Sequence, residues 1–336
     1  MMTHSIHEEE NHTRWDSSKK GFFEVYYLKW NDPSQGIAGW HRYTILSPSD
    51  ASRKPEVSIW GIFFSTKNQT APVALKSTFS LQESRIEKEI FYLSGGPSAI
   101  FASGARGNLT SGKSQMTWEF QWAQNNLSLR HLPALLYYGG FPKTKYLAPY
   151  FSTTLSGEIS VNGQRFVLNQ IPAHQGHLWG TQQAPAWAWS HCNSFAEDPS
   201  FCFEGLSAEV GITRRAPTLL FFYWQGKLYK FNSPRQWLTN ISSHSLDHWH
   251  FEAQDRDILF VGDVSADPKT MAGVRYENPD GSSRYGHNTK IADLKIQVLK
   301  KEPQGWQTIQ TLTASKTSAY EVVQLIQDDR VPLLIS

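Results

Sequence analysis

The residues best suited to chemistry lie in two short segments rich in tryptophan and histidine, at positions 174–180 and 187–193. Alternate side chains of an extended strand share a face, so four residues of the second segment would point the same way. These are Trp187, Trp189, His191 and Asn193. Indole, imidazole and amide groups on an apolar wall are typical of a pocket that orients an apolar ligand. An aromatic core whose N–H groups bond to the backbone would show the same pattern.

Two acidic residues lie among aromatic side chains and are candidate proton donors. Glu24 follows two phenylalanines, and Glu204 follows Phe-Cys-Phe. A carboxyl group buried among rings has a raised pKa and can give a proton to a substrate. The alternative for each is an edge position, or a structural ion pair with an arginine such as Arg42 or Arg214.

His248, His250 and Glu252 alternate along one expected strand and would share its face. His-x-His pairs can bind metal ions in β-barrels, and His244 and Asp247 lie nearby. A strand with a polar, solvent-facing side would carry the same letters. A metal site therefore stays an open alternative, and no cofactor is expected.

The segment Gly107–Ser114 matches the phosphate-binding pattern G-x-x-x-x-G-K-[ST] letter for letter. That chemistry needs a helix after the loop, whose N-terminus and backbone N–H groups hold the phosphates. The residues that follow, Met116–Trp122, instead alternate strictly between apolar and polar types, which is typical of a strand. We therefore interpret the segment as a hairpin turn, with a nucleotide-binding enzyme as a weaker alternative.

Near the end of the chain, a turn-forming segment is followed by a polar segment that would run back along it. Residues 276–281 read Tyr-Glu-Asn-Pro-Asp-Gly, and residues 285–288 read Tyr-Gly-His-Asn. We expect this segment to close the second half of the molecule, with Tyr285 or His287 pointing inward. A solvated loop is the alternative, because turn-rich polar segments usually lie on the surface.

Short strands separated by turns account for most of the chain, which predicts an all-β sandwich or barrel. The clearest is Met116–Trp122, which places Trp118 and three other large apolar side chains on one face. The other expected strands are Phe22–Trp30, Trp40–Leu46, Val57–Phe64, Val73–Leu81, Glu89–Leu93, Gly157–Val161, Arg165–Leu168, Ala186–Cys192, Thr218–Trp224, Lys227–Phe231, Trp249–Ala253, Ile258–Val264, Ile291–Leu299 and Trp306–Leu312.

A segment rich in proline and glycine, Pro133–Pro149, interrupts this pattern and is expected to connect two β units. We place a mobile N-terminal segment at 1–14, one β domain at 15–150 and another at 151–336. Each domain has room for a barrel of about eight strands.

Length and composition exclude several classes of protein. The 336 residues, 40% of them hydrophobic, can bury one large core or two ordinary ones, and a net charge of +2 argues against nucleic-acid binding. No run reaches the ~18 apolar residues of a membrane span, and the N-terminus lacks the pattern of a secretion signal. Two cysteines, Cys192 and Cys202, are too few for a disulfide framework, so we expect reduced thiols in the cytoplasm.

Three groups of motifs, in order along the chain, resemble one known family. They are Phe23-Glu24-Val25-Tyr26-Tyr27-Leu28-Lys29, then His177-x-Trp179-Gly180 with Trp187-x-Trp189-x-x-Cys192-Asn193, then Tyr276-x-Asn278-Pro279-Asp280-Gly281 with His287-Asn288. Together they resemble the lipocalin-like superfamily of carotenoid 1,2-hydratases, tocopherol cyclases and AttH-type proteins. The resemblance implies two lipocalin-like antiparallel β-barrels in tandem, with an apolar ligand site near their interface.

Enzymes of that superfamily protonate an isoprenoid double bond and let water or a phenol hydroxyl trap the cation. His177 and Trp179 match the His-x-Trp element of the hydratases, whereas the accompanying tyrosine and aspartate have no clear counterpart, and Glu204 is the only acid in that region.

The sequence thus predicts a protein that binds an extended, isoprenoid-like or polyketide-like molecule and catalyses its acid-promoted cyclisation, hydration or isomerisation. Glu204 or protonated His177 would supply the proton, and tryptophan rings would flank the cation. The expected ligand contacts are Trp179, Trp187, Trp189, His191, Asn193, Glu24, Arg42, Trp118, Tyr285 and His287. A non-catalytic lipid carrier and a carbohydrate-active β protein remain alternatives, and the oligomeric state stays open.

Overall fold

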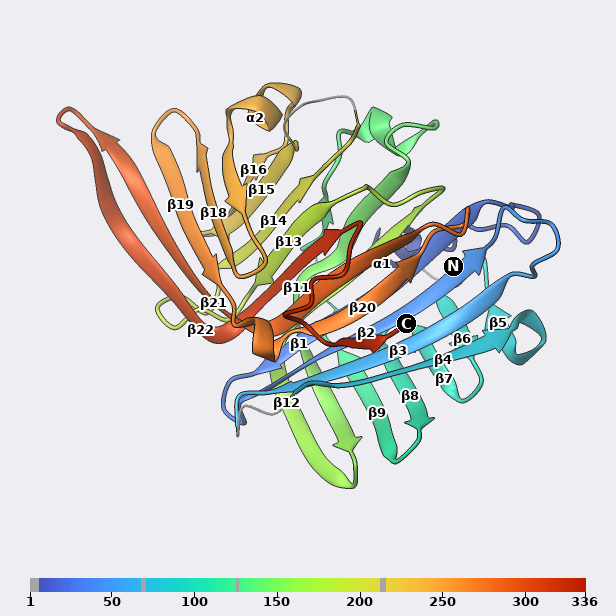
Figure 1. Cartoon of the computed structure of the whole chain (residues 1–336). Coiled ribbons are helices and arrows are strands. Elements are labelled where there is room, and N and C mark those ends of the chain that lie inside the picture. The colour runs from blue at the N-terminus through green and yellow to red at the C-terminus, as the bar shows by residue number, and fades with distance from the viewer. Residues whose placement is uncertain (1–5, 68–70, 125–126, 212–215) are drawn as a thin grey trace, which may run out of the picture.

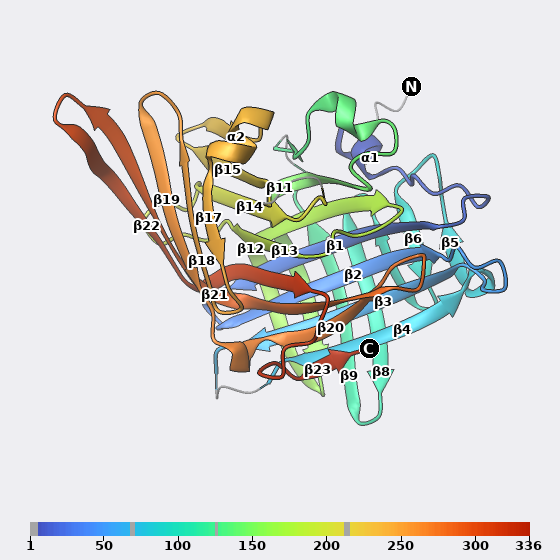
Figure 2. The same cartoon turned by 45° about the horizontal axis from the view of Figure 1, so that its top comes forward.

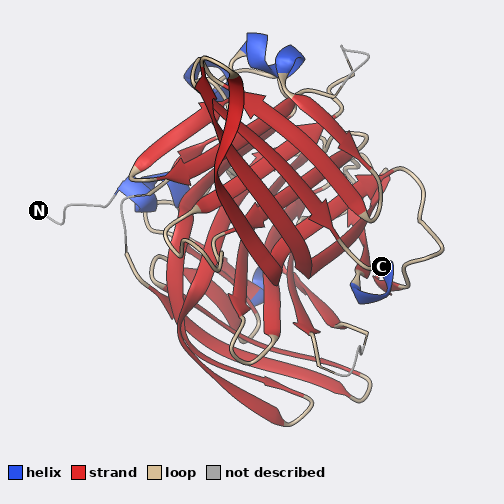
Figure 3. Cartoon of the chain, turned by 90° about the vertical axis from the view of Figure 1, so that its left-hand side faces the viewer, coloured by secondary structure: helices blue, strands red, loops and turns tan. Residues whose placement is uncertain are grey.

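The computed structural model describes residues 6–67, 71–124, 127–211 and 216–336. It confirms the all-β prediction, because two large, barrel-like sheets account for most of these residues (Figure 1). The N-terminal sheet contains the twelve strands β1–β12, and the C-terminal sheet contains the eleven strands β13–β23. Figure 3 shows that helices form only a small part of a molecule built mainly of strands.

The N-terminal sheet is antiparallel throughout, and most of its neighbours in space are neighbours in sequence. Its strands, in spatial order, are β4 (Val73–Ser80), β3 (Glu56–Ser65), β2 (Ile37–Ser47), β1 (Phe22–Asp32), β12 (Gln164–Gly180), β11 (Thr144–Val161), β9 (Ser114–Trp122), β8 (Gly104–Ser111), β7 (Ser98–Phe101), β6 (Tyr92–Gly95) and β5 (Ser84–Ile86), with β10 (Leu129–Arg130) beside β11.

The C-terminal sheet repeats this plan with a parallel pair at one edge. Its strands, in spatial order, are β16 (Lys227–Phe231), β15 (Thr218–Trp224), β14 (Cys202–Ala208), β13 (Trp187–Cys192), β22 (Gly305–Gln324), β21 (Ser283–Glu302), β19 (Ile258–Ser265), β18 (His248–Gln254) and β17 (Ile241–His244), with β20 (Ala272–Glu277) between β21 and β23 (Leu333–Ile335). The helices are α1 (Ile6–Asn11), α2 (Pro234–Thr239) and the short η1 (Leu81–Glu83), η2 (Ala134–Tyr137) and η3 (Pro268–Thr270).

Strand β1 is buried along its whole length because both of its faces are covered. Tyr26, Leu28 and Trp30 point into the core of the N-terminal sheet. Tyr27, between them, belongs to a second hydrophobic cluster. That cluster also contains Trp189 and residues of β20, β21 and β22, so it joins the two sheets.

The two sheets pack face to face over β1–β4. Figure 2 shows β21 lying over β2 and β3, and β23 lying beside β4. Because this contact uses one face of these strands and the core of the N-terminal sheet uses the other, β1–β3 are buried on both sides, whereas β4 at the sheet edge is partly exposed.

Several predicted elements differ from the structure. The expected domain boundary at 150/151 falls inside β11, whereas the chain passes from one sheet to the other at 181–186. We therefore propose a division there. Residues 9–14, expected to be mobile, contact the N-terminal sheet, because Asn11 bonds to Gln175 and the Arg14 N–H donates to Glu24. The expected strand Glu89–Leu93 begins only at Tyr92.

The phosphate-loop pattern forms a β-hairpin, as interpreted from the sequence. Strands β8 and β9 pair up to Ser111 and Ser114, and Gly112 in the turn has a φ of +59°. No helix follows, so the structure contradicts a nucleotide site of this type. Among the described residues no helix has the length and apolarity that crossing a membrane requires.

Candidate functional site

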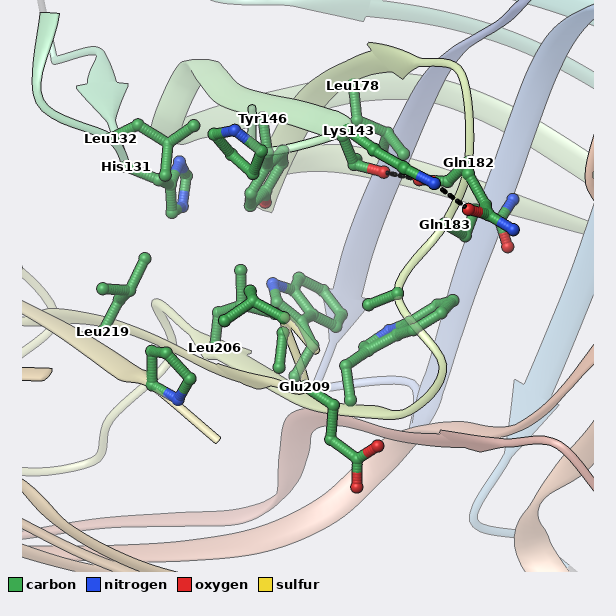
Figure 4. Close-up of a pocket in the computed structure, with 18 of the residues that line it drawn as sticks. His131, Leu132, Lys143, Tyr146, Leu178, Gln182, Gln183, Leu206, Glu209 and Leu219 are labelled. Atoms are coloured by element: carbon green, nitrogen blue, oxygen red, sulfur yellow. Dashed lines mark hydrogen bonds between the residues drawn. The ribbon is translucent and has the colours of Figure 1, made fainter. Parts of the chain in front are cut away.

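A cavity of about 570 Å³ lies between the two sheets. Apolar side chains cover most of its wall, and Figure 4 shows His131 and Tyr146 on one side of it, facing Leu206 and Leu219 on the other. A cavity of this size and character is typical of a site for a small apolar ligand.

Cross-strand pairing explains which polar groups reach the cavity. In the N-terminal sheet Tyr27 is the direct partner of Arg42 on β2. In the C-terminal sheet Trp189 on β13 is the direct partner of Glu321 on β22. Partners in such pairs project from the same face with Cβ atoms about 5 Å apart. Each sheet therefore presents one aromatic residue and one ionisable residue side by side.

The Tyr27 ring lies over a glycine of β12, where no Cβ atom blocks it. Its partner there is Gly176, and a Cβ atom at that position would lie 2.4 Å from the Tyr27 ring. The glycine thus leaves the space that the ring occupies.

A chain of buried hydrogen bonds begins at Tyr27. Its hydroxyl lies 3.0 Å from His174 Nε2 and 2.5 Å from the Tyr146 hydroxyl. The Tyr146 hydroxyl in turn donates a short hydrogen bond to Glu204 Oε1. Burial and the nearby charge of Glu204 raise the pKa of both tyrosines, so both phenols stay protonated.

Glu204, on β14, is fully buried behind these residues. Its Oε1 also accepts a 2.8 Å hydrogen bond from the Trp189 indole, and its Oε2 lies 3.2 Å from His131 Nε2. Burial opposes ionisation, but His131, His174 and the Trp189 N–H outweigh it and lower the pKa of Glu204 to about 2. The expected raised pKa is therefore wrong, because polar groups face the carboxylate.

Glu321 lies directly on the cavity wall and has the opposite electrostatic behaviour. Its carboxyl group accepts hydrogen bonds from Trp187 (3.2 Å), Tyr276 (3.3 Å) and Asn288 (3.3 Å). Burial nevertheless raises its pKa, and burial also lowers the pKa of the neighbouring Lys290 to about 7. Both shifts favour the uncharged forms of this pair.

Three of the expected ligand contacts line the cavity, namely Arg42, Trp187 and Trp189. Glu204 reaches it only through Tyr146 and Trp189, to which it is hydrogen-bonded.

His177 and Glu24 lie in a separate, closed network. His177 Nε2 is 2.8 Å from Glu24 Oε1, and its Nδ1 is 2.8 Å from the Glu10 carbonyl oxygen. Glu24 also accepts hydrogen bonds from two backbone N–H groups and the Tyr26 hydroxyl. Trp179 packs beside His177 and lies outside the cavity. His177 therefore holds the N-terminal segment and does not face the cavity.

The remaining predicted contacts also lie away from the cavity wall. His191 Nε2 is 2.9 Å from the Phe151 carbonyl oxygen, and the Asn193 side chain donates to the Ala173 carbonyl oxygen. Trp118 packs in the core of the N-terminal sheet, where its indole donates to Tyr43. Tyr285 is half-buried on β21.

His287 and the histidine pair on β18 have protein partners. His287 Nε2 accepts a hydrogen bond from the Asp328 N–H. His250 lies 2.9 Å from Asp263 and 3.2 Å from Glu252. Within the described ranges, no group of three or more His, Cys, Asp or Glu side chains has the arrangement of a metal site. Cys192 and Cys202 are buried and not joined to each other.

Four residues of the cavity wall were not predicted from the sequence, namely Tyr27, Tyr146, His131 and Glu321. Tyr146 lies in the segment expected to be a linker, and Glu321 in Ala-Tyr-Glu-Val-Val looks like any strand glutamate. Only Tyr27 could have been found from the sequence. It lies between Tyr26 and Leu28, which face the core, in a strand that is buried on both faces, so it must point to the opposite side.

Curated proteins similar in sequence to this chain include a mycobacterial protein and a plant protein. An uncharacterized protein of Mycobacterium tuberculosis is 22% identical over 291 residues, covering 85% of this chain and 83% of that protein. The chloroplastic protein of Oryza sativa subsp. japonica named "Probable tocopherol cyclase" is 22% identical over 186 residues, covering 52% of this chain and 39% of that protein.

Solved structures share the fold at very low identity. An AttH-type protein of Nitrosomonas europaea superposes with a TM-score of 0.56 at 9% identity, covering 93% of this chain and 95% of its own. Kievitone hydratase of Nectria haematococca gives a TM-score of 0.53 at 9% identity, covering 96% and 93%.

The comparisons confirm the resemblance drawn from the motifs. The family model described as tocopherol cyclase-like matches residues 151–323, just over half of the chain. That range contains Trp187, Trp189 and Glu321, which line the cavity, and Glu204, which accepts a hydrogen bond from Trp189. The chain belongs to the tocopherol cyclase-like family.

Proposed function

We propose that this protein binds an extended apolar molecule, isoprenoid-like or polyketide-like, in the cavity between its sheets and catalyses its acid-promoted cyclisation, hydration or isomerisation. The observation that carries the proposal is a pair of buried carboxyl groups whose pKa values are shifted in opposite directions around one apolar cavity. Such pairs are typical of sites that use one group as acid and another as base. The names of the family and of the hydratase that shares the fold point to the same class of reaction.

Glu321 is the proton donor in this proposal. It lines the cavity, and burial favours its protonated form. Transfer of its proton to a double bond of the ligand would leave a carbocation and a carboxylate. Trp187 donates a hydrogen bond to Glu321, and Trp189 is the direct cross-strand partner of Glu321. Both rings line the cavity, and because aromatic faces attract positive charge they would stabilise the cation.

Tyr146 and Glu204 form the proton acceptor. A proton lost from the cation, or from a water or hydroxyl oxygen that traps it, would pass to the Tyr146 oxygen while the Tyr146 proton moves to Glu204. The short hydrogen bond between the two residues supports this transfer. Glu204 would therefore act through Tyr146 and not as the acid predicted from the sequence.

The test is incubation of the purified protein with a lipid extract of its own host, followed by liquid chromatography and mass spectrometry of the bound and free fractions. A product isomeric with its precursor, or heavier by one water, would support the enzyme. A molecule retained unchanged would instead identify a carrier, and no retained or altered molecule would overturn the proposal.

Variants of the two carboxyl groups test the assigned roles. Glu321→Gln and Glu204→Gln should each lower turnover by about 10²–10⁴-fold while the ligand is still retained, because each removes one proton transfer. Glu204→Gln should also remove one limb of the pH–rate profile, which a merely structural role would not do. Glu119→Gln, an exposed residue on β9, is the control and should behave as the wild type. Full turnover in Glu321→Gln would contradict its role as donor.

A further inference from the structure

Arg42 is held rigidly at the cavity wall. It lies on β2 between Tyr27 and Trp60, its direct partners on the neighbouring strands, and is only 6% exposed. The guanidinium carbon lies 4.9 Å from the centre of the Trp60 ring and 4.4 Å from that of Tyr276. Its Nε donates a 2.9 Å hydrogen bond to Thr44. The side chain is thus positioned before any ligand binds, with further N–H donors available.

The positive charge of Arg42 has no carboxylate paired with it. None of the ion pairs found among the described residues includes Arg42. The nearby acid on the cavity wall, Glu321, is instead hydrogen-bonded to Trp187, Tyr276 and Asn288. The charge of Glu321 acts on Arg42, but burial favours the protonated form of Glu321, so Glu321 and the two aromatic rings compensate the buried cation only in part.

We infer that Arg42 binds an anionic oxygen of the ligand, so the molecule that enters this cavity is apolar with one acidic head, such as a carboxylate or an enolate. This inference rests on the proposed function for the location of the ligand. It goes further in naming the chemical class of the ligand and the end of the cavity that holds its head.

The position of Arg42 also determines where the reaction would occur on the ligand. Tyr27 is its direct cross-strand partner, and the Tyr27 hydroxyl lies 2.5 Å from that of Tyr146. A head group on Arg42 therefore places the ligand atoms a few bonds away beside these phenols. The reacting double bond lies close to the acidic head, and the rest of the chain extends along leucine side chains such as Leu206 and Leu219.

The preference for an acidic head group can be measured by binding alone, with ligands that differ only in that group. Geranylgeranoic acid, its methyl ester and geranylgeraniol share one apolar chain and differ only in the head. Their dissociation constants are obtained from quenching of tryptophan fluorescence. The wild type should bind the acid about 10- to 100-fold more tightly than the ester and the alcohol, the range expected for a hydrogen bond between charged groups.

Variants assign the preference to Arg42. Arg42→Gln should abolish the discrimination and leave the affinity for the alcohol nearly unchanged. Arg42→Lys should keep part of the discrimination, because lysine retains the positive charge but lacks the planar guanidinium group that can bind two oxygens at once. Lys143→Gln removes another cation of the cavity rim, whose Nζ bonds to Gln182, and should leave the discrimination intact.

Each other outcome has a distinct meaning. Equal affinities of the wild type for the acid and the alcohol would overturn the inference and leave the proposed apolar site standing. Loss of discrimination in Lys143→Gln but not in Arg42→Gln would also overturn it. If the wild type binds none of the three ligands, the proposed function fails together with the inference.

Discussion

Glu204 and Glu321 illustrate how surroundings decide the chemistry of one residue type. Glu204 has indole and phenol donors and two histidines around it, and its pKa falls to about 2. Glu321 also accepts hydrogen bonds, but burial outweighs them and its pKa rises. The balance between desolvation and hydrogen bonding, and not the number of neighbouring rings, separates an ionised carboxylate from a protonated acid.

Lys29 offers a separate test at the residue scale. It lies fully buried in β1, its Nζ is 3.5 Å from Asn193 Oδ1, and burial lowers its pKa from 10.5 to about 8. Because the unfolded chain binds this proton more tightly, stability is lost as the pH falls from about 10.5 to 8, by about 3 kcal/mol in total. Lys29→Met should therefore raise the free energy of unfolding by about that amount at neutral pH, and by much less above pH ~10.5.

Denaturant unfolding of both proteins across this pH range measures the difference directly. Comparison with the wild type at each pH removes the contribution of the tyrosines, which are common to both. If the difference in the free energy of unfolding between the two proteins does not change with pH, burial does not lower the pKa of Lys29.

At the scale of elements, strands serve two purposes at once. Alternate residues of β1 supply the core of the N-terminal sheet and the contact with the C-terminal sheet. Strand β12 has a glycine, Gly176, opposite Tyr27, and the absent side chain leaves room for the Tyr27 ring, which begins the chain of hydrogen bonds. The register of β1 and β12 therefore positions the site as directly as any side chain does.

Gly176→Ala should displace the Tyr27 ring, because the added Cβ atom would lie 2.4 Å from it. We expect a loss of about 1–3 kcal/mol in the free energy of unfolding, together with weaker ligand binding and turnover. Gly107→Ala is a matched control in the same sheet, since its Cβ atom would meet the Trp118 ring, outside the cavity. It should cost comparable stability and leave binding unchanged. Equal effects of both variants on binding would argue against a specific role for Tyr27.

At the scale of the whole molecule, the cavity exists only because two sheets pack together. Each sheet has a core of its own, and a third cluster with residues from both sheets lies between them. A ligand in the cavity would contact both sheets, so binding and the association of the sheets should be coupled.

Expression of residues 1–183 and 184–336 as separate chains tests this coupling. Each fragment alone should bind a hydrophobic dye, because the shared cluster becomes exposed, and should show no ligand binding. Mixing or co-expression should give a one-to-one complex with lower dye binding and restored ligand affinity, measured by size-exclusion chromatography and fluorescence. Two fragments that stay monomeric and free of dye would show that the contact contributes little.

The amino-acid sequence alone determined the β architecture and its turns, and it offered Trp187 and Trp189 as pocket or core residues, of which both lie on the cavity wall. These features follow from alternation and turn chemistry within a few residues, where local preferences act. The same local reasoning correctly separated the hairpin at Gly107–Ser114 from a phosphate loop, because a strand pattern follows it.

Only the tertiary structure decided which groups act together. Tyr27 and Tyr146 are 119 residues apart in sequence, and Tyr146 and Glu204 are 58 apart, yet they form one chain of hydrogen bonds. His177, which the motif favoured, is instead enclosed by Glu24 and the N-terminal segment. A pKa depends on the charges, donors and burial around a group, and these come from strands that meet only when the sheets are formed and packed.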